Sequence, residues 1–342
     1  MTEDAMTSSA CLAARQAVAV MDRSHFGRLL VTGANRLDLL HRITTNDLRS
    51  IGPGQGAQTV LLTEKGRIID DLRLYARGDD YYLITSPGNQ ARVRERIEKL
   101  RMRDDVTLED VTAITAMFSL VGPLSAGLLE SAAGAPLMEE IPLHHHAHLV
   151  IDGHALLAAR TTDMGGSGFN LIVATGAAPS VWAVLLDRGR ALGVRTLDEQ
   201  AWEMLRIERG VPAFGRELTD EHNPLEARLD AAISWNKGCY VGQEVVVRLH
   251  SRDKVAKLLM GLRLEPGSVP PAGSPIESPG RPGIEAGRLT SVAAAAHLGC
   301  VIGLAYVRTE CCAAGTRLVI VSEGGRVSAE VSELPFRAPP RP

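Results

Sequence analysis

The chain changes character near Lys257, and this change constrains the fold more than any other feature of the sequence. Before Lys257, segments with helical periodicity alternate with strand-like segments, whereas after it helical periodicity disappears. Proline, glycine and serine cluster between residues 266 and 283, and short β-prone stretches lie on both sides of that cluster. This pattern predicts a separate all-β unit, a barrel or a sandwich, over residues 256–336, with a proline-rich tail at 337–342.

The remaining 255 residues predict a different class of fold. A chain of 342 residues is too long for one compact core and suggests two or three domains. Two successive blocks each combine several strands with a helix, which predicts paired α+β units without detectable sequence repetition. One of the helices is expected after a capping box at Thr196–Glu199 and ends at Gly210.

Composition and charge exclude several classes of protein. The net charge of −3 gives no global basic field for nucleic acid, and no apolar run reaches the roughly 20 residues of a membrane helix. Glu3 and Asp4 are untypical of a signal or transit peptide. Five cysteines without CxxC spacing fit a reducing compartment. We therefore expect a cytoplasmic monomer that binds neither nucleic acid nor membrane.

Lys237–Glu244, which reads KGCYVGQE, is the one segment whose cysteine has a setting suited to reactivity. Lys237 lies two residues before Cys239, and Gly238 and Gly242 allow backbone conformations closed to other residues. Further basic residues follow at Arg248, His250, Arg252, Lys254 and Lys257. Positive charge lowers the pKa of a thiol and favours the reactive thiolate. A buried structural cysteine is the alternative, because free cysteines usually behave as small hydrophobes.

A second candidate site lies on the middle one of three predicted strands. These strands span Gln58–Thr63, Arg67–Tyr75 and Tyr81–Thr85. Side-chain alternation places Asp70 and Asp71 on opposite faces, and Asp71 shares its face with Arg73. One aspartate is then expected to point inward or into a groove. The alternative is an edge strand with two solvated acids.

Other clusters carry weaker signals. Ser86-Pro87 is expected to open a helix whose arginine-rich face is either solvated or a surface for anions. The histidines at 144–146 and 148 alternate faces without an adjacent carboxylate or cysteine, so we expect no metal site there. Cys300, Cys311 and Cys312 lack the spacing of a stable iron–sulfur site and are interpreted as structural thiols.

Several of these segments together resemble one family. KGCYVGQE resembles the signature of the YgfZ-type folate-binding proteins, which are relatives of the glycine cleavage T-protein, an aminomethyltransferase. The other matching elements, in chain order, are VTGA and TTND at 31–34 and 44–47, GRIIDDL at 66–72, LRIERGVP at 205–212 and NPLEA at 223–227. The resemblance runs from about residue 22 to residue 265 and continues more weakly to residue 336.

The resemblance implies an α+β fold with three domains in a cloverleaf. Two intertwined α+β subdomains, with limits near residues 55 and 112, would form a folate-binding region over 1–255, and a β-barrel would occupy 256–336. Tetrahydrofolate or a one-carbon derivative would be the cofactor, because a pterin suits a buried carboxylate and the glutamate tail suits arginine. Cys239 and Lys237 would be the catalytic pair. The implied folate contacts are Asp71, Arg206, Gly238, Tyr240, Gln243 and Glu244.

Two departures from the T-protein pattern bear on the choice between functional hypotheses. The T-protein's YTGE-type stretch corresponds here to Asp163–Gly166, so a glycine replaces the pterin-binding acid. This loss and the added cysteine favour a tetrahydrofolate-binding protein that supports iron–sulfur clusters, including those of tRNA-modifying enzymes, with client or assembly proteins as partners. The alternative is a folate-dependent one-carbon transferase that uses Asp71, and whether the chain is an enzyme stays open. A non-catalytic, folate-sensing scaffold is a third hypothesis.

Overall fold

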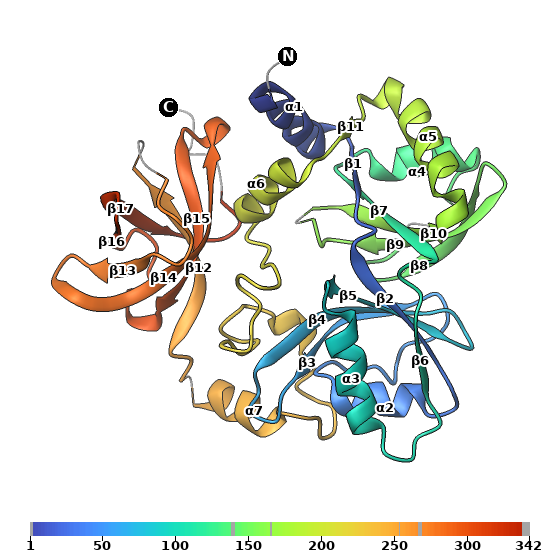
Figure 1. Cartoon of the computed structure of the whole chain (residues 1–342), viewed down its shortest axis with the longest axis horizontal. Coiled ribbons are helices and arrows are strands. Elements are labelled where there is room, and N and C mark those ends of the chain that lie inside the picture. The colour runs from blue at the N-terminus through green and yellow to red at the C-terminus, as the bar shows by residue number, and fades with distance from the viewer. Residues whose placement is uncertain (1–2, 138–140, 165, 253, 266–268, 337–342) are drawn as a thin grey trace. The chain divides into compact units, whose positions relative to one another are not determined.

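The computed structural model describes residues 3–137, 141–164, 166–252, 254–265 and 269–336 (Figure 1). It divides into two compact units. The first unit consists of Met1–Glu64, Ile69–Trp202 and Ala231–Val241. The second unit consists of Lys65–Ile68, Glu203–Asp230 and Gly242–Pro342. Each unit therefore combines segments that are distant in sequence.

The first sheet of the first unit has five strands in the order β3-β4-β5-β2-β6. The strands are β2 (Phe26–Thr32), β3 (Gly56–Leu62), β4 (Ile68–Ala76), β5 (Tyr81–Pro87) and β6 (Thr107–Asp110). Helices α2 (Arg36–Ile43) and α3 (Gln90–Arg101) pack against this sheet (Figure 1). Leu40 of α2 and Val93 of α3 share one core with Leu29 and Leu72, and all four are fully buried. Burial of these aliphatic side chains is the main stabilising contribution here.

The second sheet of the first unit has the order β11-β1-β7-β10-β9-β8. Its strands are β1 (Ala19–Asp22), β7 (Thr115–Val121), β8 (His146–Ile151), β9 (His154–Thr161), β10 (Gly168–Ala174) and β11 (Arg195–Thr196). Helices α4 (Ser125–Ala133) and α5 (Ala178–Gly189) contribute to its core, and α1 (Glu3–Gln16) precedes β1. A smaller cluster, in which Tyr75 and Ile84 pack with Met117 and Ile172, joins the two sheets. The chain passes from one sheet to the other at residues 23–25 and again at 111–114.

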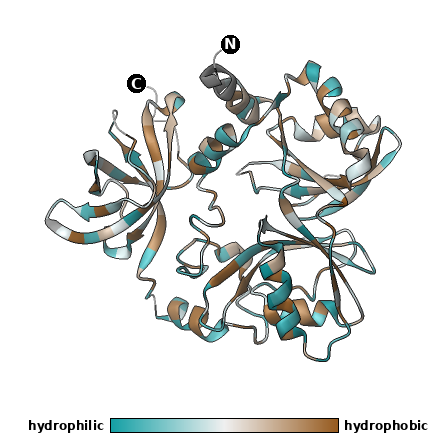
Figure 2. Cartoon of the chain, in the orientation of Figure 1, coloured by the Kyte–Doolittle hydropathy of each residue, from teal (hydrophilic) through white to brown (hydrophobic). Residues whose placement is uncertain are grey.

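The second unit contains a closed barrel in the order β12-β15-β14-β13-β16-β17. Its strands are β12 (Lys257–Leu264), β13 (Pro275–Ser278), β14 (Arg281–Ala295), β15 (Cys300–Arg308), β16 (Arg317–Ser322) and β17 (Gly325–Ser332). Exposed and buried residues alternate along β17, and colour alternates in the same way along the barrel strands of Figure 2. α6 (Glu199–Arg209) leads the chain into this unit, and α7 (Gln243–Ser251) precedes the barrel. The predicted α+β fold with a C-terminal β-barrel is confirmed.

Two local predictions were wrong, and one alternative, the edge strand, is excluded. Pro87 ends β5, and the following helix begins only at Gln90. β4 lies between β3 and β5, so its aspartates are not on an edge strand. Thr196 belongs to β11, and it is Asp198 whose carboxylate accepts a hydrogen bond from the Ala201 N–H at 2.7 Å at the start of α6. Among the residues that the structure describes, no helix is long and apolar enough to span a membrane.

Candidate functional site: a buried charge network in the first unit

Asp70 faces the interior between β4 and β5. It is fully buried, and its carboxylate accepts hydrogen bonds from the Ser86 N–H at 3.0 Å and from the Ser86 hydroxyl at 2.6 Å. Burial raises the pKa of Asp70 to about 6, although the hydrogen bonds from Ser86 act in the opposite direction. Asp70 therefore fastens two adjacent strands and is not open to a ligand.

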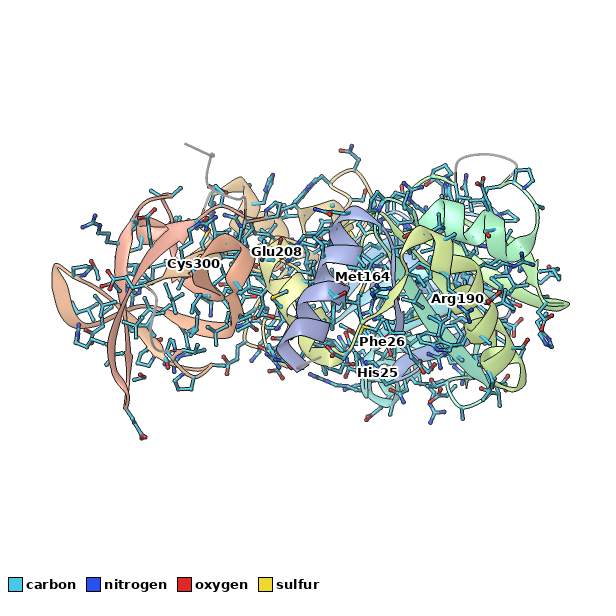
Figure 3. The ribbon with its side chains drawn as sticks, turned by 90° about the horizontal axis from the view of Figure 1, so that it is seen from above. His25, Phe26, Met164, Arg190, Glu208 and Cys300 are labelled. Atoms are coloured by element: carbon cyan, nitrogen blue, oxygen red, sulfur yellow. The ribbon has the colours of Figure 1, made fainter. Side chains whose placement is uncertain are left out.

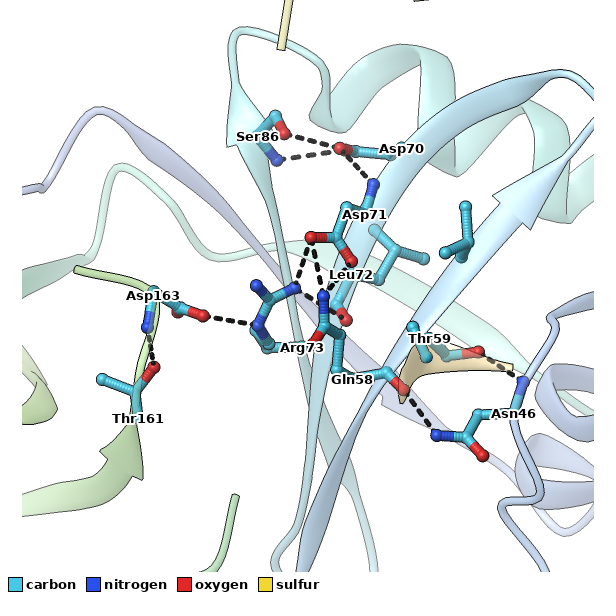
Figure 4. Close-up of polar contacts among 12 residues, drawn as sticks. Asn46, Gln58, Thr59, Asp70, Asp71, Leu72, Arg73, Ser86, Thr161 and Asp163 are labelled. Carbon is cyan, nitrogen blue, oxygen red and sulfur yellow. Dashed lines mark hydrogen bonds and ion pairs between the residues drawn. The ribbon is translucent and has the colours of Figure 1, made fainter. Parts of the chain in front are cut away.

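Asp71 points to the other face of β4, where its charge is already paired (Figure 4). The Arg73 Nη1 lies 2.9 Å from Oδ2, and the Gln58 Nε2 lies 3.0 Å from both carboxylate oxygens. The side chain is only 9% exposed. Burial raises the pKa of Asp71, while Arg73 and Gln58 partly offset that effect. The predicted folate-binding acid is thus present, but a cation of the chain itself neutralises it.

Arg73 extends the network to Asp163, which follows β9 of the second sheet. Its Nε lies 2.6 Å from the Asp163 Oδ1, and the Asn170 amide donates to the Asp163 Oδ2 at 3.1 Å. Burial works against ionisation of Asp163, yet Arg73 and Arg23 hold its pKa below the usual value. The two carboxylates hold the pKa of Arg73 above its usual value despite burial. Sequence reasoning missed this pair, because no local pattern links residues 90 positions apart.

Arg23, in the segment between the two sheets, is a further residue that sequence reasoning missed. Its side chain is buried, and its guanidinium lies 3.7 Å from the centre of the Phe26 ring. One N–H reaches the Met164 sulfur at 3.5 Å, and Figure 3 labels Phe26 and Met164, which both contact it. The Nε has no hydrogen-bond partner among the described residues, and burial lowers the pKa of Arg23 to about 10. A buried N–H donor without an acceptor is costly and suits an acceptor atom of a ligand.

Lys237 does not lie where the thiolate hypothesis requires it. Its ammonium donates to the backbone carbonyls of His41, Thr44 and Asn46, the last two at 2.7 and 2.8 Å. These three bonds use all the donors of an ammonium group. Burial lowers the pKa of Lys237 to about 8. Lys237 therefore anchors its own segment to the end of α2 and has no donor left for the Cys239 sulfur.

The rest of the KGCYVGQE segment divides between exposed and buried residues. Gly238 and Cys239 are exposed, and Cys239 is a free thiol. Tyr240 is buried, burial raises its pKa to about 12, and its hydroxyl has no partner within the described part of the chain. Gln243 and Glu244 begin α7 in the second unit. Folate contacts by these residues stay a prediction.

Arg206 has a structural role in the second unit that leaves no donor for folate. It is 1% exposed, and it contacts Glu203 at 2.6 and 2.7 Å and Glu217 at 3.1 Å. Its remaining bonds go to the Val211 carbonyl at 3.2 Å and the Ser291 hydroxyl at 2.6 Å. Together these bonds use all five N–H donors of a guanidinium. The predicted folate contact of Arg206 is therefore replaced by a buried ion pair that holds α6 to the barrel strand β14.

No metal centre is evident in the part of the chain that the structure describes, where no three histidine, cysteine or carboxylate side chains are grouped to hold an ion. Cys300, Cys311 and Cys312 are free and partly exposed. The Cys312 sulfur lies 3.3 Å from the Val307 carbonyl, and burial raises its pKa, which makes it less reactive. Cys239 is thus the exposed thiol among the described cysteines.

Two β-sheets that pack with helices, a closed barrel and an aspartate network on β4 define a protein with the architecture of an aminomethyltransferase. Residues 2–237 match the GCVT N-terminal domain, and residues 257–337 match the glycine cleavage T-protein C-terminal barrel domain. The chain belongs to this T-protein family.

Similar proteins agree with this assignment. A putative chloroplastic transferase of Arabidopsis thaliana is 35% identical over 95% of this chain and 72% of its own length. An aminomethyltransferase of Shouchella clausii is 30% identical over 95% of this chain and 88% of its own length. The crystal structure of aminomethyltransferase T from Bartonella henselae has a TM-score of 0.86 at 22% identity, covering 97% of this chain and 90% of that one. The last similarity concerns the fold alone.

Proposed function

We propose that this chain binds a tetrahydrofolate in its first unit and supports the assembly or repair of iron–sulfur clusters through the thiol of Cys239. Its clients would include the clusters of tRNA-modifying enzymes. One contrast carries the proposal: the Asp71 carboxylate is already ion-paired with Arg73, whereas the Cys239 thiol is free and exposed. The group available for chemistry is therefore the sulfur.

The Arg73 ion pair argues against one-carbon transfer as the main activity. An acid that assists such a transfer stabilises positive charge developing on the reacting nitrogen. In this chain a permanent positive charge lies 2.9 Å from the Asp71 carboxylate and competes for that role. An exposed thiol, in contrast, is suited to bind a metal or to exchange sulfur when it ionises.

Two features of the first unit fit a folate. The Arg23 Nε offers a buried donor without a partner, which a pterin oxygen or nitrogen would satisfy. Asp71 offers carboxylate oxygens to pterin N–H groups, and Gln58 holds them in position. Tetrahydrofolate would supply a one-carbon carrier at this site, while Arg23, Asp71 and Gln58 would bind and orient it.

Calorimetry with tetrahydrofolate tests the binding half of the proposal. We expect saturable binding to the wild-type chain and a loss of roughly 2 kcal/mol in binding free energy for Asp71→Ala, because a hydrogen-bonded charged group is removed. Glu98→Ala, on the exposed face of α3, is the matched control and should bind as the wild type does. A wild-type chain that does not bind tetrahydrofolate would refute the proposal.

Complementation tests the thiol half. In a strain that lacks this protein, we expect wild type and Cys300→Ala to restore the activity of iron–sulfur enzymes and Cys239→Ala to fail. Cys300 is the matched control because it is a free, partly exposed thiol of the second unit. Full restoration by Cys239→Ala would show that the thiol has no such role.

A one-carbon transferase is the second candidate function. The curated names of several relatives, which are aminomethyltransferases, and the presence of Asp71 favour it. An assay with an aminomethyl-lipoyl carrier protein and tetrahydrofolate decides the matter. Formation of methylene-tetrahydrofolate would support this candidate, and its absence would exclude it.

A further inference from the structure

We infer that Gln58, Asn46 and Lys237 form a chain of positioning residues through which occupancy of the Asp71 carboxylate controls the reactivity of the Cys239 thiol. The inference rests on the proposed function, because it takes a tetrahydrofolate as the occupant. The whole chain of contacts lies within the first unit. It connects the two segments, around Asp71 and around Cys239, that the sequence singles out separately.

The first link joins Asp71 to Gln58. The Gln58 Nε2 lies 3.0 Å from the Asp71 Oδ1 and 3.0 Å from its Oδ2, so this one amide group contacts both carboxylate oxygens (Figure 4). Arg73 contacts Oδ2 from another direction. A ligand N–H group that approaches Oδ1 competes with Gln58 for that oxygen. Binding at Asp71 therefore acts directly on the position of the Gln58 side chain.

The second link joins Gln58 to Asn46. The Asn46 amide donates to the backbone carbonyl of Gln58 at 2.8 Å, and the Asn46 N–H donates to the Thr59 hydroxyl at 2.9 Å. Figure 4 shows Asn46 facing the strand that carries Gln58 and Thr59. Two bonds from one residue to consecutive strand positions fix Asn46 to β3. A shift of β3 at Gln58 is thereby passed to the loop after α2.

The third link joins Asn46 to the Cys239 segment. The Asn46 carbonyl accepts a hydrogen bond from the Lys237 ammonium at 2.8 Å. The neighbouring Thr45 donates from its hydroxyl to the Ala232 carbonyl at 2.6 Å and accepts from the Ser234 N–H at 3.1 Å. The segment that ends in Cys239 is therefore fastened at three points to residues 45 and 46. Cys239 itself is exposed, two residues beyond the last of these points.

Burial suits this series of hydrogen bonds to transmit a change in structure from Asp71 to Lys237. Thr45 and Thr59 are fully buried and Lys237 is 8% exposed, whereas Asn46 and Gln58 are partly exposed, so water is largely excluded from the Thr45 and Thr59 hydroxyls. A ligand that orders the Asp71 end should restrict the motion of the thiol segment, which is coupling through reduced flexibility. Direct covering of the thiol by the ligand would also protect it, and the experiment must separate the two.

The test measures the rate at which iodoacetamide alkylates Cys239, resolved by mass spectrometry of peptides, with and without saturating 5-formyltetrahydrofolate. For the wild-type chain we expect the ligand to slow alkylation about fivefold, the lower end of typical coupling. Gln58→Leu is assayed at a ligand concentration that saturates this variant by calorimetry, and there the ligand should change the alkylation rate by less than about twofold. Cys300 in the same samples is the internal reference and should not respond.

Control variants complete the test. Ser86→Ala removes the hydroxyl hydrogen bond to the neighbouring Asp70, keeps the backbone one, and should keep the full effect of the ligand. Asn46→Ala breaks the chain one link later and should behave as Gln58→Leu does, which provides a second variant if the first is unstable. If the ligand protects Cys239 fully in both Gln58→Leu and Asn46→Ala, it covers the thiol directly and the inference is overturned. Ligand binding to the wild type without any change in alkylation would also overturn it. Absence of binding by calorimetry would instead refute the proposed function.

Discussion

At the scale of single residues, two adjacent aspartates of β4 have opposite electrostatic situations. Asp70 is buried with uncharged donors around it, among them Ser86 and the Asn89 side chain, and burial raises its pKa despite them. Asp71 lies against a guanidinium, which partly offsets the same effect of burial. Because side chains alternate in direction along a strand, these two neighbouring residues point to opposite faces and have different surroundings. The two acids are therefore not interchangeable.

The ionisation of Asp70 predicts a dependence of stability on pH. Burial raises its pKa from 3.8 to about 6, so between these values the folded chain keeps a proton that the unfolded chain has released. The contribution of Asp70 to the free energy of unfolding therefore falls as the pH rises through this window, by roughly 3 kcal/mol. Urea unfolding between pH 4 and pH 6 measures this for the wild type and Asp70→Asn. The difference between their free energies of unfolding should change with pH. Parallel profiles would contradict the assignment.

Removal of the Arg73 guanidinium should destabilise the chain strongly. Arg73→Leu leaves Asp71 and Asp163 without their buried cation, which costs about 3 to 5 kcal/mol in typical cases. Chemical unfolding measures this change. The matched control is Arg94→Leu on the exposed face of α3, which should stay within about 0.5 kcal/mol of the wild type. Equal effects of the two substitutions would show that the ion pair has no structural role.

At the scale of elements, a buried ion pair contributes to the contact of α6 with the barrel. Arg206 and Glu217 are 1% and 0% exposed, and the Ser291 hydroxyl of β14 bonds to both. Arg206→Leu alone leaves the buried Glu217 carboxylate without its ion-pair partner and should lower the free energy of unfolding by about 3 to 5 kcal/mol. The double variant Arg206→Leu with Glu217→Leu should recover part of that loss. A double-mutant cycle by urea unfolding measures the coupling, and simple additivity would contradict it.

Elements with local signals could be predicted, and those set by distant partners could not. The strands around Asp71 followed from alternation and turn residues, and the barrel followed from the change of texture near Lys257. The position of β4 between two strands depends on pairings that no local pattern encodes. Pro87 signalled a helix start, but it ends β5, where a register irregularity in the pairing with β2 tolerates a proline.

The candidate site shows the same division. Asp71 was predicted, and Arg73 was placed beside it by alternation, but Asp163 comes from another sheet. Lys237 was assigned to Cys239 because the two are close in sequence, yet its donors reach carbonyls more than 190 residues away. Sequence proximity is a poor guide for long side chains, because their flexible stems allow the charged head to find buried acceptors.

At the scale of the whole molecule, neither compact unit is one continuous segment. The barrel shares its unit with residues 203–230, whose Glu226 carbonyl accepts from the Leu259 N–H and whose Glu217 carbonyl accepts from the Tyr306 hydroxyl. A fragment of residues 257–337 loses these acceptors. We therefore expect a fragment of residues 203–342 to melt cooperatively at a higher temperature than 257–337 in circular dichroism. Equal melting would show that the extra segment does not support the barrel.

The ion pair between Arg73 and Asp163 also has a consequence for how this family diverges. Because the pair joins two sheets of the first unit, loss of Arg73 alone would leave two buried carboxylates, Asp71 and Asp163, without the guanidinium that contacts both. Substitutions at the two positions should therefore be inherited together, and relatives with an uncharged residue at position 73 should also have one at position 163. An alignment in which the two positions vary independently would remove this constraint. If the two positions vary together, the pair marks a lineage within the family more directly than either residue does by itself.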